Sequence, residues 1–118
     1  MSDMYLNVRT FIMACDQDQD EKNAGLYHKL IVEEFQEYID ALFAKDEVET
    51  LDACMDMIWV ILGFCYMKGY DVDGAWKEVA RSNLAKINDM TGKVIKREDG
   101  KVLKPEGWTP PQLKQFVK

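Results

Sequence analysis

Cysteine is scarce in this sequence, and its number does not fit a disulfide-stabilised secreted protein. Three cysteines occur among 118 residues, whereas a disulfide framework uses an even number. Cys54 and Cys65 fall in one apolar run that we predict to be helical, which places their sulfur atoms too far apart to bridge. Reduced thiols, as in a cytoplasmic protein, are the simplest interpretation.

The sequence also lacks a long hydrophobic segment. The longest nearly apolar run, residues 53–67, has 15 residues and includes Asp56, whereas a membrane-spanning helix needs about 20 apolar residues. The first ten residues contain Asp3 and no apolar stretch, so they are unlike a secretory signal. We therefore expect a cytoplasmic location and no membrane partner.

Positive charge is in short supply and unevenly placed. The net charge is −6 and the isoelectric point about 4.7, which argues against nucleic acid as a ligand because a phosphate backbone attracts a basic surface. Residues 1–85 hold 7 basic and 17 acidic side chains, and residues 86–118 hold 8 basic and 4 acidic ones. This asymmetry indicates a ligand site with an acidic and a basic part.

Length and hydrophobic pattern predict one all-α domain over residues 1–118, with a helical body at about 4–88 and a basic tail at about 89–118. The apolar spacing predicts a four-helix core followed by a short irregular or hairpin tail. The predicted helices cover about 4–15, 26–45, 47–68 and a stretch from 71 or 73 to about 87. In the tail, Asp99-Gly100 predicts a hairpin turn, and one helical turn is expected within 112–117.

Acidic side chains occupy inward positions of two predicted helices. In the second helix Glu34 lies inside the apolar arc and Glu37 near its edge, while Glu33 points away. In the third helix Asp56 is the one charge of the apolar run, and Asp52 stands one turn before it. A lone buried carboxylate is costly unless it is paired or bound to a metal. These acids are therefore candidate metal ligands.

The spacing of the acids favours a hard divalent cation. Glu34 and Glu37 are spaced i, i+3 in the second helix, and Asp52 and Asp56 are spaced i, i+4 in the third. Either spacing places the two side chains of a pair on one helix face. Four like charges repel, and oxygen ligands suit Mg²⁺ or Mn²⁺. A di-iron site would need Glu-x-x-His pairs, and the single histidine, His28, is in none. Two alternatives stay open: a solvated acidic face on the second helix, and an Asp56–Arg81 ion pair.

Basic and polar residues cluster from the fourth helix onward. Asn83 and Lys86 share a helix face. More cations follow in the tail, namely Lys93, Lys96, Arg97, Lys101 and Lys104. We expect some of them to hold the phosphates of an anion whose other oxygens lie on the metal, and a solvated basic tail is the alternative.

Several segments together resemble the MazG-type all-α nucleoside triphosphate pyrophosphatases. They are EEFQE at 33–37, ETLDACMD at 49–56 and SNLAK at 82–86. The tail, GKVIKREDGKVLKP and WTPPQL, is similar to the phosphoribosyl-ATP pyrophosphohydrolase-like branch. The family pattern E-E-x-x-E, then E-x-x-D, matches except that Ala53 stands where the second motif has Glu. Asp52 is the nearest substitute. Glu49-x-x-Asp52 is an alternative match to the second motif, but it leaves Asp56 unexplained.

The resemblance implies Mg²⁺-dependent hydrolysis of a (d)NTP between its α- and β-phosphates, with Mn²⁺ as a possible substitute, in a homodimer or homotetramer. It implies metal ligation by four acids: Glu34, Glu37, Asp52 and Asp56. It implies a proton acceptor at Glu34 or Glu33, with substrate contacts from Asn83, Lys86, Lys96 and Arg97. Two alternatives remain: an enzyme acting on phosphoribosyl-ATP in histidine synthesis, and a non-catalytic helical module that binds a nucleotide or a protein.

Overall fold

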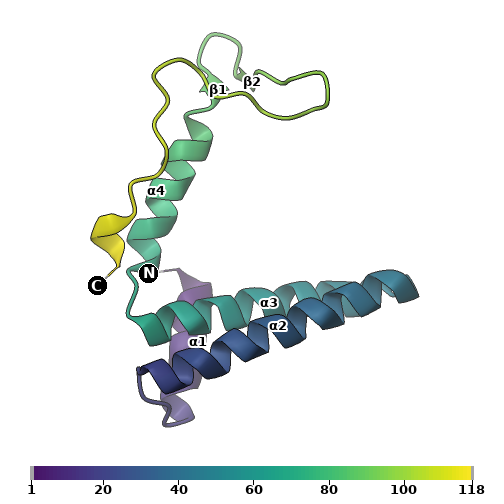
Figure 1. Cartoon of the computed structure of the whole chain (residues 1–118), viewed down its shortest axis with the longest axis vertical. Helices are drawn as coiled ribbons and strands as arrows, with labels where there is room; N and C mark the ends of the chain where they lie inside the picture. Colours follow the sequence, from purple (N-terminus) through teal and green to yellow (C-terminus); the bar gives the residue numbers. More distant parts are fainter. Residues whose placement is uncertain (1, 118) are drawn as a thin grey trace. The chain divides into compact units, whose positions relative to one another are not determined.

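A computed structural model describes residues 2–117 (Figure 1). It contains four α-helices and a two-stranded antiparallel hairpin, which confirms the all-α prediction. The elements are α1 (Asp3–Ala14), α2 (Glu21–Ala44), α3 (Glu47–Lys68), α4 (Val72–Leu84), β1 (Ile87–Asn88), β2 (Lys93–Val94) and the 3₁₀ turn η1 (Lys114–Phe116). Contacts group residues 2–72 into one unit and residues 73–117 into a second. Among the described residues, no helix is long and apolar enough to span a membrane.

The second helix begins five residues earlier than we predicted. Asp20 ends the preceding loop in an extended conformation, and its carboxylate accepts a hydrogen bond from the Asn23 amide at 2.8 Å. This N-cap satisfies one of the free amides of the first turn. Gly25, which we took as the end of the loop, lies inside the helix.

The α2–α3 pair is a helical hairpin with a two-residue connection (Figure 1). Lys45 takes a left-handed conformation that ends α2, and the Asp46 carboxylate caps α3 by accepting from the Glu49 amide at 3.0 Å. The predicted bounds of α3 are confirmed, and so is its C-terminal glycine, because Gly69 has a φ of 71°. A short connection holds the two helices antiparallel, so the end of α2 faces the start of α3.

The core of the first unit lies where α1 crosses the α2–α3 hairpin. Its most deeply buried side chains are Val8 and Ile12 of α1, which pack with Tyr27 of α2 and with Val60 and Met67 of α3. The three cysteines are free thiols, as we predicted. The unit therefore takes its stability from apolar packing.

Gly63 allows α3 to approach α2 at Tyr27, which predicts a stability effect. A Cβ at position 63 would overlap the buried Tyr27 ring, whose hydroxyl donates to Gln17 Oε1 at 2.9 Å. Overpacking there outweighs the helix-propensity gain of alanine, so we expect Gly63→Ala to destabilise the protein by about 1–2 kcal/mol in urea unfolding. Gly25→Ala is the control, since nothing lies within 4 Å of its added methyl; equal stability of the two variants would contradict this packing.

In the second unit, α4 ends at Leu84, about three residues before the predicted end at 87. The chain turns into a strand because Ile87 pairs with Val94 and Asn88 with Lys93. The Asn88 side chain stabilises the connection by accepting from the Met90 amide at 2.8 Å. Our sequence analysis did not foresee this hairpin.

The remainder of the tail follows the prediction more closely. The 98–101 turn is confirmed, with the Arg97 amide donating to the Lys101 carbonyl at 2.7 Å and Lys96 bridged to Val102. The 3₁₀ turn η1 falls within the predicted 112–117. Glu78 of α4 joins the tail to the helix, because its carboxylate accepts from the Gln112 amide at 2.6 Å.

Glu78 also bears on the alternative that Arg81 forms an ion pair with Asp56. Its Oε1 lies 2.7 Å from Arg81 Nε. The hydrogen bond from Arg81, followed by that from the Gln112 amide, lowers the pKa of Glu78 to about 2. Arg81 therefore has its ion-pair partner within α4, and the sequence-based suggestion that it neutralises Asp56 is not needed.

Candidate functional site

The α2–α3 hairpin encloses an acidic pocket of about 510 Å³ within the first unit. Seven of its ten lining residues are acids, and the other three are alanines. The acids are Glu34, Glu37, Asp40, Asp46, Glu49, Asp52 and Asp56, and the alanines are Ala41, Ala44 and Ala53. Small side chains leave the space, while carboxylates supply its polar groups, so the pocket is suited to a cation.

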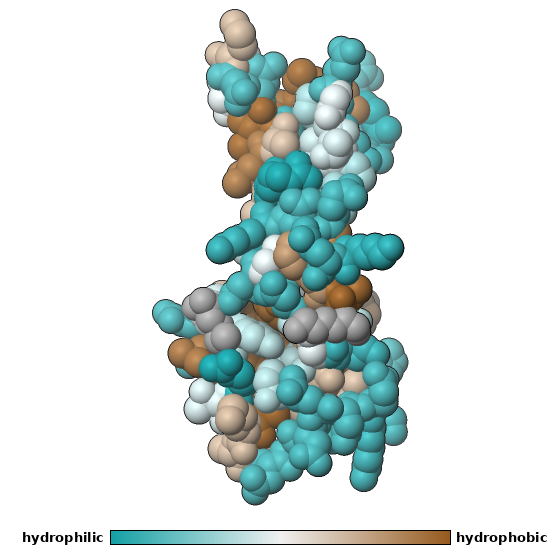
Figure 2. Space-filling view, turned by 90° about the vertical axis from the view of Figure 1, so that its left-hand side faces the viewer, coloured by the Kyte–Doolittle hydropathy of each residue, from teal (hydrophilic) through white to brown (hydrophobic). Residues whose placement is uncertain are grey.

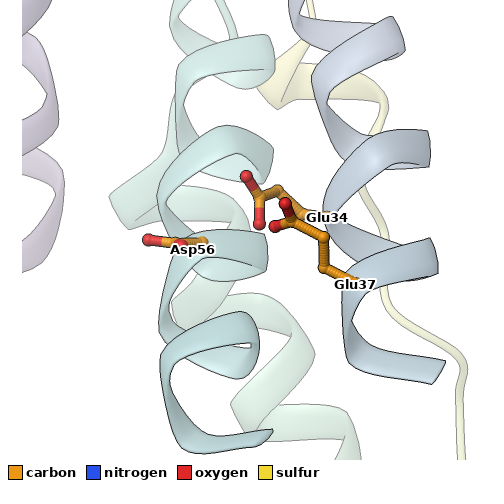
Figure 3. Close-up of side chains that lie close together, drawn as sticks. All are labelled: Glu34, Glu37 and Asp56. Atoms are coloured by element: carbon orange, nitrogen blue, oxygen red, sulfur yellow. The ribbon is translucent and has the colours of Figure 1, made fainter. Parts of the chain in front are cut away.

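Three of these acids converge. Glu34, Glu37 and Asp56 each offer a carboxylate oxygen, and these oxygens lie within 4.8 Å of one another. Figure 3 shows Glu34 and Glu37 extending from α2 and Asp56 standing on α3. Glu34 and Asp56 are half-buried and Glu37 is exposed, so the cluster has a solvent-facing side through which a ligand can enter.

Glu34 is the most strongly perturbed acid of the cluster. Its Oε2 atom is buried, and no donor among residues 2–117 reaches it. A hydrogen bond shared with Glu37 is the main cause that raises the pKa of Glu34 to about 7, followed by desolvation and by the charges of Glu37, Asp56 and Asp52. A proton therefore takes the place of a positive partner when no cation is bound.

Asp56 responds to the same environment. Desolvation raises its pKa above the usual value, and the charges of Asp52 and Glu37 and a hydrogen bond with Asp52 raise it further. Asp52 thus touches Asp56 and lines the pocket, although it stands outside the group of three. Ala53, where the resembling family has Glu, is buried in the pocket wall and contributes only a methyl group.

This arrangement fits Mg²⁺ or Mn²⁺. Crowded carboxylates with raised pKa values repel one another, and the buried Glu34 oxygen lacks a donor. A hard divalent cation with oxygen ligands would offset the repulsion between the carboxylates and give the buried Glu34 oxygen a positive partner. The open side of the pocket leaves room for water and phosphate oxygens, which Mg²⁺ retains in its coordination shell.

Of the remaining acids, Glu33 was predicted as a site residue but lies outside the pocket, Glu49 belonged to an alternative motif frame and lines the pocket, and Asp40 and Asp46 line it without having been predicted. Glu33 is exposed and does not line the pocket. Asp40, Asp46 and Glu49 line it. Asp40 continues the three-residue spacing from Glu37, a signal in the sequence that we had not used. Asp46 lines the pocket because it is the N-cap residue of α3.

The predicted substrate-binding residues all belong to the second unit. Lys86 Nζ donates to Asn83 Oδ1 at 3.1 Å, so these two residues do share a surface. Arg97 is engaged with Asp99, with its Nε 2.9 Å from Asp99 Oδ1. Lys96 lies in the bridged part of the tail hairpin.

The perturbed pKa of Glu34 predicts how stability depends on pH. Because its pKa in the folded protein, about 7, exceeds the ordinary 4.5, the folded state binds more protons between these values, and stability falls as pH rises through this window. In EDTA we expect the Tm to drop by several degrees between about pH 5 and pH 8. Mg²⁺ should remove most of this drop, and Glu34→Gln should flatten it. Identical thermal profiles with Mg²⁺ and with EDTA would count against a cation site.

The four helices and the acidic pocket define a class before any comparison: an all-α protein with a carboxylate cluster that could hold a metal ion. Residues 13–83 match the family model described as phosphoribosyl-ATP pyrophosphohydrolase. The match spans more than half of the chain, and the protein belongs to this family of the all-α NTP pyrophosphatase superfamily. A search of curated proteins finds no match.

The segment that matches the family model includes the acidic pocket but not the basic tail. The matched segment contains all of α2 and α3 and ends at Asn83, before Lys86. It implies a pyrophosphohydrolase that acts on a phosphoric anhydride of a nucleotide, in a family that is typically Mg²⁺-dependent.

Proposed function

We propose that the protein is a nucleoside triphosphate pyrophosphohydrolase that cleaves (d)NTPs between the α- and β-phosphates, giving (d)NMP and pyrophosphate. The convergence of Glu34, Glu37 and Asp56 carries this proposal, together with the family match. A non-catalytic module gains nothing from half-buried acids that repel one another. Their retention in one pocket favours catalysis over simple structural use.

The carboxylates divide the work of the reaction. Glu34, Glu37 and Asp56 would hold Mg²⁺, with Asp52 supporting Asp56 in place of the glutamate that Ala53 replaces. When bound, the cation neutralises phosphate oxygens and lowers the pKa of an attacking water. Glu34 would take the proton of that water as a general base.

The second unit supplies the cations of the proposed reaction. We assign Lys86 and Asn83 to the phosphates of the substrate, because a lysine ammonium stabilises the charge that develops on the leaving pyrophosphate. Lys96 and Arg97 remain proposed contacts, although Arg97 would have to exchange Asp99 for a phosphate. The first unit thus carries the proposed metal pocket and the second unit the proposed phosphate contacts.

Phosphoribosyl-ATP is the second candidate substrate. The description of the matching family favours it directly. It carries the same triphosphate as ATP, so the carboxylates would play the same roles on either molecule. The two substrates therefore have to be compared by experiment.

We also propose that the protein forms homodimers or homotetramers through its first unit. α3 exposes a row of apolar side chains: Leu51, Met55, Ile58 and Ile61. On the face of the molecule drawn in Figure 2, brown apolar areas lie among teal hydrophilic ones. A large exposed apolar patch marks a protein interface. Light scattering should give a dimeric or tetrameric mass, and Ile58→Glu should lower it; a monomeric native protein would contradict the assignment.

The proposed activity is tested by a substrate panel. Purified protein is incubated with each common NTP and dNTP and with phosphoribosyl-ATP, in Mg²⁺, Mn²⁺ or EDTA. Monophosphate and pyrophosphate that form with metal and vanish with EDTA would support the proposal and rank the substrates. Absence of turnover on every compound, with the metal bound, would favour a binding module instead.

A further inference from the structure

A second pocket lies in the tail unit, after all the residues of the acidic pocket in the sequence. Its volume is about 270 Å³. Two lysines, one asparagine, one glutamate and three apolar residues line it, namely Lys86, Lys104, Asn88, Glu106, Ile95, Leu103 and Pro105. It therefore combines two positive charges with an apolar wall.

The two lysines gather on one aromatic ring. Lys86 Nζ lies 5.3 Å and Lys104 Nζ 4.9 Å from the ring centroid of Trp108. Both ammonium groups are therefore held near the ring by cation–π attraction. Among the described residues, no carboxylate forms an ion pair with either lysine. Two uncompensated cations in one pocket are a favourable partner for an anion.

The ring that gathers the lysines is fixed in place. The Trp108 indole N–H donates to the carbonyl of Ser82 in α4 at 2.6 Å. The Trp108 amide donates to the Pro105 carbonyl at 3.1 Å, closing a turn in which Gly107 has a φ of 79°. A left-handed conformation at this place favours glycine. Because the turn and the ring are already ordered, little entropy is lost when the pocket binds a ligand.

Arg97, in the same tail, differs from this pair of lysines. Arg97 is neutralised by Asp99, whereas the apolar side chains of Ile95 and Leu103 line the lysine pocket. Glu106 contributes one opposing charge, so the two lysines still leave the pocket net positive.

We propose that this pocket binds phosphate groups, with Lys104 and Lys86 as the cations that hold them. The choice of a nucleotide polyphosphate or its pyrophosphate product as the natural ligand rests on the proposed function. Lys104 thereby becomes a phosphate-binding residue in a segment outside the family match, which ends at residue 83. Trp108 positions both lysines and does not contact the anion through a charge of its own.

Titration of the full-length protein with inorganic pyrophosphate in EDTA tests this pocket. The probe is the indole N–H signal of each tryptophan, assigned to Trp108 with a Trp108→Phe variant. We expect the Trp108 signal to shift while those of Trp59 and Trp76 stay in place. Lys104→Ala should raise the Kd for pyrophosphate about fivefold to tenfold, because one charge-assisted contact is lost.

Matched variants separate this pocket from general charge effects and from catalysis. Lys101→Ala removes the same charge from the same exposed loop and should leave the Kd within about twofold, whereas Lys104→Arg should retain binding. Equal affinity of the Lys104→Ala and Lys101→Ala variants, or an unmoved Trp108 signal, would overturn the proposal. Because the titration is done in EDTA, it tests this pocket apart from catalysis. Lys104-dependent pyrophosphate binding, together with no turnover of any nucleotide in Mg²⁺, would overturn the proposed function and leave this pocket in place.

Discussion

Asp56→Asn is expected to lower pyrophosphate release by at least about a thousandfold, equivalent to about 4 kcal/mol of activation free energy. The substitution replaces one of three converging carboxylates with a neutral amide of the same size. Mg²⁺ prefers charged oxygen ligands, so the variant should lose the cation and with it the charge neutralisation of the phosphates. Initial rates at saturating Mg²⁺ measure the loss.

Stability should move in the opposite direction. Asp52 and Glu37 repel Asp56 and raise its pKa, so removing its charge relieves repulsion in metal-free protein. Asp56→Asn should therefore be as stable as the native protein in EDTA, or more stable, but should no longer gain stability from Mg²⁺. Glu47→Gln, in the first turn of α3 and outside the pocket, is the matched control. Full activity in Asp56→Asn would remove Asp56 from the metal site.

Glu34→Gln and Glu33→Gln are expected to differ by about two orders of magnitude or more in turnover. These neighbours have the same chemistry, but Glu34 faces the pocket with an elevated pKa while Glu33 is exposed and does not line it. Glu33→Gln should keep turnover within about threefold of native. Loss of a general base alone costs about a hundredfold to ten-thousandfold.

A pH profile separates the two glutamates further. If Glu34 accepts the proton, native turnover should rise with pH as the Glu34 carboxyl loses its own proton, and Glu33→Gln should keep this profile. Bound Mg²⁺ favours the carboxylate and should move the rise below the pKa of about 7 that applies without metal. A large loss in Glu33→Gln with an active Glu34→Gln would reverse the assignment.

The sequence alone predicted the helices whose ends carry standard caps, and the acids that share a helix face. α3 was predicted at its observed bounds because an acidic start and Gly69 mark both ends. α2 was misjudged at its start because Gly25 resembled a loop residue, although Asp20 caps the helix earlier. The inward positions of Glu34 and Asp56 followed from helical periodicity, and both are half-buried in the structure.

The parts that were missed depend on contacts that periodicity cannot describe. Periodicity shows which residues share a face of one helix. The geometry of the hairpin decides which face of α3 packs against the acidic face of α2. Asp46 was therefore recognised as a pocket residue only in the structure, whereas Glu49 had been considered in an alternative motif frame. In the tail, the pairing of β1 with β2 ended α4 early. Lys86 meets Trp108 only because the tail folds back onto α4, which periodicity does not predict.

The position of bond cleavage tests the central claim most directly. The protein is incubated with its best nucleoside triphosphate and Mg²⁺ in ¹⁸O-enriched water, and the products are followed by ³¹P NMR and mass spectrometry. We predict pyrophosphate and a nucleoside monophosphate in equal amounts, with one ¹⁸O atom in a single product and no reaction in Asp56→Asn. Release of orthophosphate and a nucleoside diphosphate, or equal rates in Asp56→Asn, would contradict a pyrophosphohydrolase that works through this carboxylate pocket.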